Sequence, residues 1–468
     1  MIIGSLFAFL IPVMTGLLIV YLSWPDQSSV FKNPLLKFSL AIGIGFGISS
    51  LCFFIWAIIL GPKNGFVPCV MSELLLLTVL SSVALRDAKK KTVPQMQDYC
   101  THSNSVKRQL LYKILLNVTC ITLAMTVVSF ICKSLKEPHG SWDAWAIWNL
   151  HARFLFRGDL DWRNVFIIYW AQPDYPFLIP GLIARCWEFI GKEIVWIPAI
   201  TAMFFTFGTV GVIISSLSML KGRTEGLLGG LMLMGTPFFI KLGAAQYADV
   251  PLSFFFCSAL ALFSIIDYSY HDREKLLPLA GLMAAFSAWT KNEGTMFLFS
   301  LMAARFIVVM GFRGFKAYFR EIKLLMIGIM PVALILVYFK LYLAPPNDLF
   351  TGNVLARLTN FSRCFYILKA SRNLFMRFGV FYIGAIVLLL LPTFMSGAAI
   401  KKKDIPVTLT LFITLSFMAC SYFLAYLITP HELNWHLSTS LDRLFLQLGP
   451  GTILLILFLF KSTEEIGR

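Results

Sequence analysis

Acidic and basic residues stand at points where long apolar runs of the sequence meet short polar stretches. Asp143 lies in SWDAWAIWNLHARFLF, just past an apolar run, and Asp249 lies in QYADVPLSFFF, at the start of another. Lys291 and Glu293 lie in WTKNEGTMF, and Arg443 lies in DRLFLQLGP. A carboxylate within hydrogen-bond reach of a hydroxyl can accept its proton. A guanidinium fork suits the oxygens of a phosphate. The residue types therefore allow proton transfer beside an anion.

Each of these residues also has an ordinary structural interpretation. Asp143 could be a solvated charge or a helix cap, with Trp142 and Trp145 as part of an aromatic belt at a membrane interface. Asp249 could be the acid that favours the positive end of a helix dipole. Lys291 to Glu293 could form a polar turn between two helices. The order of these stretches along the chain decides between the interpretations.

The composition is that of a polytopic membrane protein. Of 468 residues, 58% are hydrophobic and 14% are charged, and the mean hydropathy is +0.77. Soluble domains carry about 25% charged residues. The net charge of +16 fits basic cytoplasmic loops better than nucleic-acid binding. The nine cysteines form no CxxC pair, so they indicate neither a zinc site nor a disulfide framework.

About thirteen segments are long and apolar enough to span a membrane, which takes roughly 20 residues each. They lie near residues 2–24, 36–60, 66–85, 110–133, 194–219, 226–244, 250–267, 276–290, 294–311, 324–343, 378–398, 405–428 and 446–461. The first has no basic segment before it and is interpreted as a retained helix. The basic loop that ends near residue 109 suggests an accessory N-terminal segment, 1–109, and a membrane core, 110–468.

Lysines and arginines predict the orientation, because they concentrate in short cytoplasmic loops. When the spans alternate, six basic clusters fall on one side: 86–108, 221–223, 273–275, 313–323, 401–403 and Lys461. The N-terminus is then outside and the C-terminus inside. The outer side receives the segments 136–193, 344–377 and 429–450 and the turn before Asp249. Within the first, the apolar stretch 175–191 is expected to lie in the outer interface, anchored by Arg185 and Trp187.

This arrangement resembles the GT-C superfamily of integral-membrane glycosyltransferases, which includes protein O-mannosyltransferases, lipid A aminoarabinose transferases and bacterial envelope glycosyltransferases. The similarity covers about three-quarters of the chain, from the fourth span to the C-terminus. SWDAWAIW places Asp143 at the family's catalytic acid after a spanning helix, and QPDYPFLIPGL resembles its proline-aromatic interfacial segment. Asp249 matches a second outer acid, and Arg443 a basic position before a late span. Many relatives have two adjacent acids at the first site, whereas Ala144 follows Asp143 here.

The resemblance implies an all-helical GT-C fold with a large outer loop that carries interfacial helices. It also implies transfer of a sugar from a polyprenyl-phosphate donor to a hydroxyl of a glycan, lipid or protein. Asp143 would be the general base of an inverting reaction, and Asp249 would position the acceptor or a divalent cation. The donor phosphate would meet Arg443, Lys291 and Arg372. The residues expected to contact the substrates are Trp142, Trp145, Tyr175, Tyr247, Glu293 and His436.

No metal ligand is assigned from the sequence, and Mg²⁺ or Mn²⁺ is the one cofactor left open. The expected partners are the lipid-linked donor, its acceptor and membrane lipid, with no nucleic acid. The expected location is the plasma (inner) membrane, with the site facing the periplasm. The alternative is a transporter, flippase or export component for lipid-linked carbohydrate, which predicts charged residues inside the spans and openings to both faces.

Overall fold

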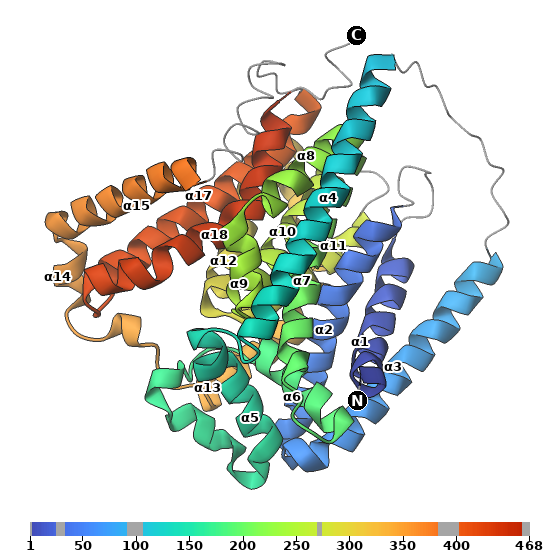
Figure 1. Ribbon diagram of the computed structural model, residues 1–468, viewed down its shortest axis with the longest axis vertical. Helices are drawn as coiled ribbons and strands as arrows, with labels where there is room; N and C mark the ends of the chain where they lie inside the picture. Colours follow the sequence, from blue (N-terminus) through green and yellow to red (C-terminus); the bar gives the residue numbers. More distant parts are fainter. Residues whose placement is uncertain (1, 25–32, 91–105, 269–273, 382–401, 461–468) are drawn as a thin grey trace.

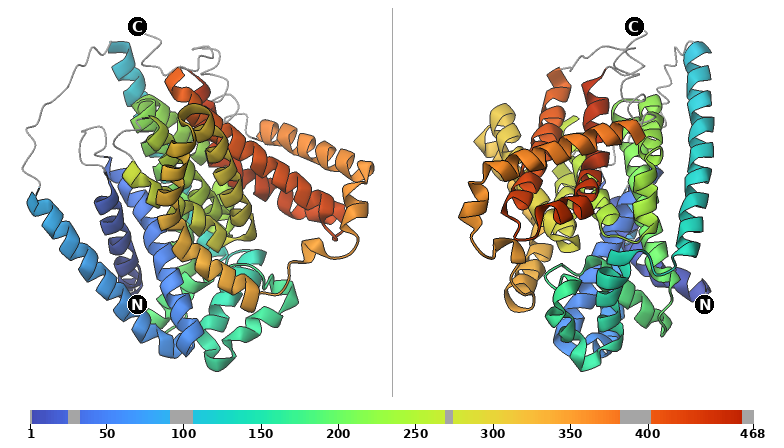
Figure 2. Two further views of the ribbon diagram at one scale, coloured as in Figure 1. Left: turned by 180° about the vertical axis from the view of Figure 1, so that it is seen from behind. Right: turned by 60° about the vertical axis from the view of Figure 1, so that its left-hand side comes forward.

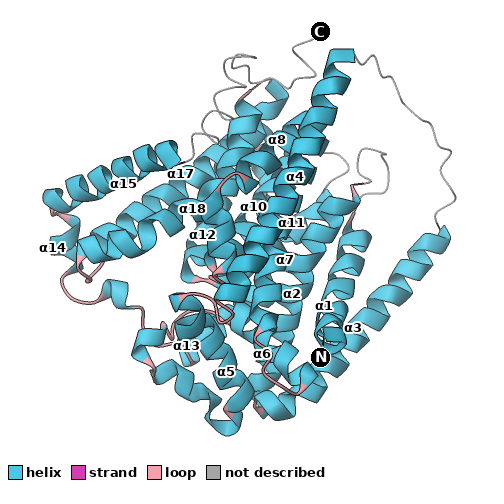
Figure 3. Cartoon of the chain, viewed as in Figure 1, coloured by secondary structure: helices cyan, strands magenta, loops and turns pink. Residues whose placement is uncertain are grey.

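The structure, a computed structural model, describes residues 2–24, 33–90, 106–268, 274–381 and 402–460. Every regular element in these ranges is a helix (Figure 3). Ten of these helices are long and apolar enough to cross a membrane, and the bent pair α8 and α9 would add an eleventh span. The prediction of an all-helical, multi-pass membrane protein is confirmed.

The ten long apolar helices are α1 (Ile2–Ser23), α2 (Pro34–Leu60), α3 (Pro62–Lys90), α4 (Val106–Lys136), α7 (Trp196–Leu220), α10 (Asp249–Tyr268), α12 (Asn292–Arg313), α13 (Phe315–Tyr342), α17 (Ile405–Ile428) and α18 (Leu433–Leu459). The other helices are η2 (Ala144–Trp148), α5 (Asn149–Arg157), η3 (Asp159–Ile167), η4 (Tyr169–Ala171), α6 (Leu178–Ile190), α8 (Arg223–Met234), α9 (Pro237–Ala244), η5 (Glu274–Leu276), α11 (Leu277–Thr290), η6 (Asp348–Phe350), α14 (Val354–Leu358), α15 (Phe361–Phe381) and η7 (Lys402–Asp404). The short helices α5 and α6 lie at one end of the bundle, and α14 and α15 lie beside α17 and α18 (Figures 1 and 2).

The expected count of thirteen spans is not confirmed. The segment near 226–244 is two helices, α8 and α9, bent by 63° at the break. Pro237 begins α9, and Thr236 before it is extended, with φ −98° and ψ 91°. A residue before proline avoids the helical region, so the chain turns there. Helix α11 has only 14 residues, and the expected span 378–398 lies mostly outside the described residues.

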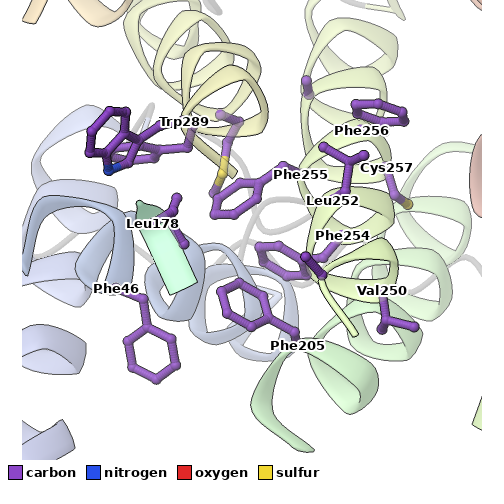
Figure 4. Packing of buried hydrophobic residues seen from close by; sticks show 14 of the residues in the cluster. Phe46, Leu178, Phe205, Val250, Leu252, Phe254, Phe255, Phe256, Cys257 and Trp289 are labelled. Carbon is purple, nitrogen blue, oxygen red and sulfur yellow. The ribbon is translucent and has the colours of Figure 1, made fainter. Parts of the chain in front are cut away.

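Helices α2, α7 and α10 form the centre of the bundle. In Figure 4, Phe46 of α2, Phe205 of α7 and Phe254 of α10 lie together among other buried side chains. Small residues allow this approach, as is common between membrane helices. A Cβ atom on Gly43 would stand 2.3 Å from a ring carbon of Phe254, and one on Gly45 would stand 1.9 Å from the carbonyl oxygen of Pro12.

The first three helices share a hydrophobic core with the rest of the chain. Helix α2 packs against α6 and α7 as well as against α1 and α3. One continuous cluster of buried apolar side chains includes Phe9 of α1, Phe53 of α2 and Phe205 of α7. The described part of the expected N-terminal segment 1–109 therefore shares its core with the rest of the chain, and its role as an accessory segment stays a prediction.

The anchoring role expected for Arg185 and Trp187 is wrong, because α6 is enclosed by other helices. Arg185 is 0% exposed and Trp187 is 1% exposed. Arg185 forms an ion pair with Glu73 of α3 and donates from Nη1 to the carbonyl oxygen of Ala8 in α1, at 2.5 Å. The sequence does not reveal this ion pair, because Glu73 lies more than a hundred residues before Arg185. Without its acidic partner, Arg185 has the pattern of an interfacial anchor.

The expected start of the last span near residue 446 is also wrong, because α18 begins at Leu433 and contains most of the segment 429–450. Glu432 accepts hydrogen bonds from the backbone N–H groups of Asn434 and Trp435, at 2.9 and 2.6 Å. This cap begins the helix. Leu437, Leu441 and Leu444 then form a buried stripe at helical spacing. The polar residues in between made the segment look like a loop.

A buried ion cluster closes the end of the bundle where α10 and α12 finish. Arg305 is fully buried and binds Asp267 through Nη1 at 2.5 Å and Glu321 through Nε at 2.7 Å. Arg313 also reaches Asp267, at 2.9 Å. Paired and hydrogen-bonded charges of this kind can be buried where single ones cannot.

The segment between α4 and α7 contains a buried neutral histidine. His151 of α5 stacks on Phe177, and its Nε2 lies 2.9 Å from the carbonyl oxygen of Ala171. Burial lowers the pKa of His151 to about 4, and the hydrogen bond to Ala171 opposes this shift only in part. The imidazole is therefore neutral in the folded protein and donates its Nε2 proton.

Acid should destabilise the protein through His151. The unfolded chain takes up a proton near the ordinary pKa of about 6.5, whereas the folded chain does so only near 4, so stability falls as the pH drops between these values, by up to about 3 kcal/mol. His151→Gln keeps a donor for Ala171 but does not titrate, so its melting temperature in detergent should fall less between pH 7 and 4.5. The exposed His139→Gln is the matched control. Equal acid sensitivity of wild type and His151→Gln would contradict this prediction.

Candidate functional site

Residues from four distant parts of the chain meet at the end of the bundle that carries α5 and α6. Asp143 directly precedes η2, and Asp249 is the first residue of α10. Lys291 is extended, with φ −160° and ψ 158°, in the break between α11 and α12. Arg443 and Gln447 lie one turn apart on α18. These residues make direct side-chain contacts, and we call them the Arg443 cluster.

Arg443 connects the two aspartates. Its Nη2 donates to Oδ2 of Asp143 at 2.6 Å and to Oδ2 of Asp249 at 2.8 Å, and its Nε donates to the same oxygen of Asp249 at 3.0 Å. The guanidinium carbon lies 4.7 Å from the centre of the Tyr247 ring, a cation–π distance. Within the described residues, Nη1 has no hydrogen-bond partner.

Asp249 is completely enclosed, and both its oxygens are occupied. Besides Arg443 on Oδ2, Oδ1 accepts from Lys291 Nζ at 3.0 Å and from Gln447 Nε2 at 2.5 Å. The hydroxyl of Tyr422 donates to Oε1 of Gln447 at 2.6 Å, which turns the amide N–H toward Asp249. A buried carboxylate is tolerated only with such partners. Asp249 therefore holds the cations in place and has no free oxygen to take a proton.

Asp143 differs from Asp249 in both exposure and contacts. Its side chain is 17% exposed, whereas that of Asp249 is 0% exposed. Only Oδ2 is bonded, to Arg443, and Oδ1 has no hydrogen-bond partner within the described ranges. Asp143 is thus the carboxylate of this pair that a substrate hydroxyl can approach.

Lys291 and two tyrosines complete the polar lining. Lys291 Nζ pairs with Glu293 at 2.7 Å and lies 5.7 Å from the centre of the Tyr175 ring. Burial raises the pKa of Tyr175, and burial together with the Asp143 carboxylate raises the pKa of Tyr247. Both phenols therefore stay protonated near neutral pH and can donate hydrogen bonds. Glu293 Oε2 is buried without a partner among the described residues.

A second polar cluster fixes the segment that carries Tyr175. Asp174 accepts from Asn292 at 2.7 Å and from Asn347 at 2.8 Å. Lys340 donates to the carbonyl oxygen of Asp174 at 2.5 Å and to Asn292 at 2.7 Å. Tyr175, the next residue, stacks on Trp148 with ring centres 5.4 Å apart. The loop 172–177 is thereby tied to α12 and α13, beside Lys291.

Most of the site residues predicted from the sequence come together here, and some do not. Those in or against the Arg443 cluster are Asp143, Asp249, Lys291, Glu293, Arg443, Tyr175 and Tyr247. Trp142 and Trp145 are exposed beside Asp143, with ring centres 4.5 Å apart. Arg372 is exposed on α15, outside the cluster. His436 binds Thr429 Oγ1 through Nδ1 at 3.0 Å, about two turns before Arg443 on α18.

Gln447, Tyr422, Asp174 and Lys340 were not predicted from the sequence. Gln447 had one available signal, a polar residue in an apolar helix four positions after Arg443. Tyr422 and Lys340 resemble many other residues near span ends. Only their contacts show what they do.

The donor set of the Arg443 cluster does not suit a divalent cation. No group of three or more His, Cys, Asp or Glu residues in the described part of the chain could hold a metal ion. Asp249, the most buried acid, already accepts from Arg443, Lys291 and Gln447. A Mg²⁺ or Mn²⁺ ion on Asp249 would have to displace one of these partners.

Comparisons of the chain with protein-family models, with curated proteins and with solved structures found no match.

Removing the guanidinium of Arg443 should lower the stability of the protein, because the buried Asp249 then loses a cationic partner. Arg443→Gln leaves that carboxylate with fewer cationic partners and should lower stability by about 3 kcal/mol or more. The double variant Asp249→Asn/Arg443→Gln removes the buried charge as well and should recover part of the loss. Thermal unfolding in detergent measures both. A double variant that is no more stable than Arg443→Gln would contradict this account of Asp249.

Proposed function

We propose that the chain is a membrane glycosyltransferase of the GT-C type. It would transfer a sugar from a polyprenyl-phosphate donor to an acceptor hydroxyl, at the extracytoplasmic face of a bacterial plasma membrane. The observation that carries the proposal is Arg443, held between the partly exposed Asp143 and the buried Asp249. The proposed reaction needs a cation for the donor phosphate beside an accessible base, and Arg443 with Asp143 would supply both.

The cations of the cluster suit a leaving phosphate. The free Nη1 of Arg443 can donate to a phosphate oxygen, and a guanidinium can do so with two parallel N–H groups. Lys291 uses its ammonium on Asp249 and Glu293 and has a third proton to donate. These two residues can neutralise the charge that develops on the phosphate, so no step of the reaction needs a metal ion.

Asp143 would act as the general base. Its carboxylate takes the proton of the acceptor hydroxyl, and the acceptor oxygen forms a bond to the anomeric carbon. The bond between that carbon and the phosphate oxygen breaks, and its electron pair leaves with the phosphate beside Arg443. Attack from the face opposite the leaving group inverts the anomeric centre.

The long apolar helices support a membrane location, which is where a lipid-linked donor is found. The exposed rings of Trp142 and Trp145 next to Asp143 suit both a membrane interface and the face of a sugar. When the spans of the sequence alternate, its basic clusters fall on the side opposite to the site, which supports an N-terminus outside and a C-terminus in the cytoplasm. Contacts of Arg372 with the donor and of His436 with a substrate stay predictions.

A transfer assay with Asp143→Asn tests the proposal. Wild type in lipid nanodiscs, given radiolabelled polyprenyl-phosphate sugars and crude envelope acceptor, should move label to the acceptor. Asp143→Asn should lose about 100-fold or more of that rate, because the amide cannot accept the proton. Asp161→Asn, a matched change of an exposed acid in η3, should keep full activity.

Two other outcomes would each overturn part of the proposal. Equal transfer by wild type and Asp143→Asn would keep the glycosyltransferase and remove Asp143 as its base. No donor consumed by folded wild type, with lipid-linked sugar crossing the bilayer of proteoliposomes, would replace the enzyme by the transporter or flippase alternative.

A further inference from the structure

We infer that Asp143 and the donor phosphate compete for the same edge of Arg443, so that binding of the donor is the event that frees the base. The inference rests on the proposed function and adds to it an order of events. In this structure Asp143 occupies the position on Arg443 that the phosphate would take.

The geometry of the guanidinium carries the argument. Arg443 offers one edge made by Nε and Nη2 and another made by Nη1 and Nη2. Asp249 takes the first edge, since Nε and Nη2 both donate to its Oδ2, at 3.0 and 2.8 Å. The remaining proton of Nη2 points along the second edge and is used by Asp143 at 2.6 Å. A phosphate that binds the second edge with two N–H groups must take this proton from Asp143.

The two carboxylates hold Arg443 with unequal strength. Asp249 is fully buried, contacts two nitrogens of Arg443 and is braced by Lys291 and Gln447. Asp143 is partly exposed and contacts a single nitrogen. Solvent screens the exposed pair more than the buried one. An arriving anion therefore displaces Asp143, while Asp249 keeps the guanidinium in place.

The exchange has a chemical consequence. While Asp143 pairs with Arg443, its Oδ2 is held by Nη2 and is not available to an acceptor hydroxyl. Once phosphate takes its place on Arg443, the carboxylate is free to receive the acceptor proton. The acceptor hydroxyl is then activated only after the donor has bound.

The test measures binding rather than turnover. Farnesyl phosphate, which has no sugar to transfer, is titrated into purified protein in nanodiscs. Asp143→Asn removes the competing charge, so it should bind farnesyl phosphate about tenfold more tightly than wild type, although it has lost transfer activity. Asp442→Asn is the matched control: it removes a carboxylate from the neighbouring position of α18 and should leave the affinity unchanged.

A second variant tests whether the gain passes through Arg443. Arg443→Lys keeps the positive charge but cannot offer two parallel N–H groups, so adding Asp143→Asn to it should give little further gain. Melting temperatures confirm that each variant is folded.

Each other outcome overturns the inference in a recognisable way. An unchanged or weaker affinity of Asp143→Asn would show that the two anions do not compete, while transfer by wild type would still support the proposed function. An equal gain in Asp442→Asn would reduce the effect to net charge. No binding of farnesyl phosphate by wild type or any variant would remove the phosphate site from Arg443 altogether.

Discussion

The structure of the site depends on one buried charge. Asp249 is fully enclosed at the start of α10, a helix whose residues are buried from Asp249 to Asp267. Burying an unpaired carboxylate at such a place would cost more free energy than the whole stability of a typical folded protein. Its four hydrogen bonds come from Arg443, Lys291 and Gln447, on α18 and in the break before α12. The need to satisfy this acid therefore sets the positions of both cations and brings the end of the chain next to its middle.

The same rule explains the other charges buried among apolar helices. Arg185 meets Glu73 between α6 and α3, and Arg305 meets Asp267 and Glu321 where α10 and α12 end. In those two groups Arg185, Glu73, Arg305 and Glu321 are paired and buried, which suits a role in holding helices in register. The Arg443 cluster differs because one of its acids, Asp143, is partly exposed and one edge of its arginine is incompletely used. That incompleteness makes it the candidate functional site.

Hydrogen bonds from neighbouring residues hold the side chains of the Arg443 cluster in place. Tyr422 orients Gln447, and Asp174 with Lys340 holds the loop that sets Tyr175 beside Lys291. Preorganised charges of this kind need little rearrangement when charge develops in a reaction. The buried, neutral His151 contacts residues at both ends of this loop without adding charge. It stacks on Phe177 and donates to the carbonyl oxygen of Ala171.

The sequence by itself determined the class of the protein, the approximate places of most long helices, and the acids and bases that meet in the Arg443 cluster. Apolar run length and the polar breaks between runs are local properties, so Asp143, Asp249, Lys291 and Arg443 stood out without a structure. Only the tertiary structure decided which charged side chains form ion pairs with each other. It moved residues 433–450 from a loop into α18, enclosed Arg185 against Glu73, and showed Asp249 saturated while Asp143 keeps a free oxygen. The physical reason is that burial and pairing depend on partners up to 300 residues apart, which no local pattern records.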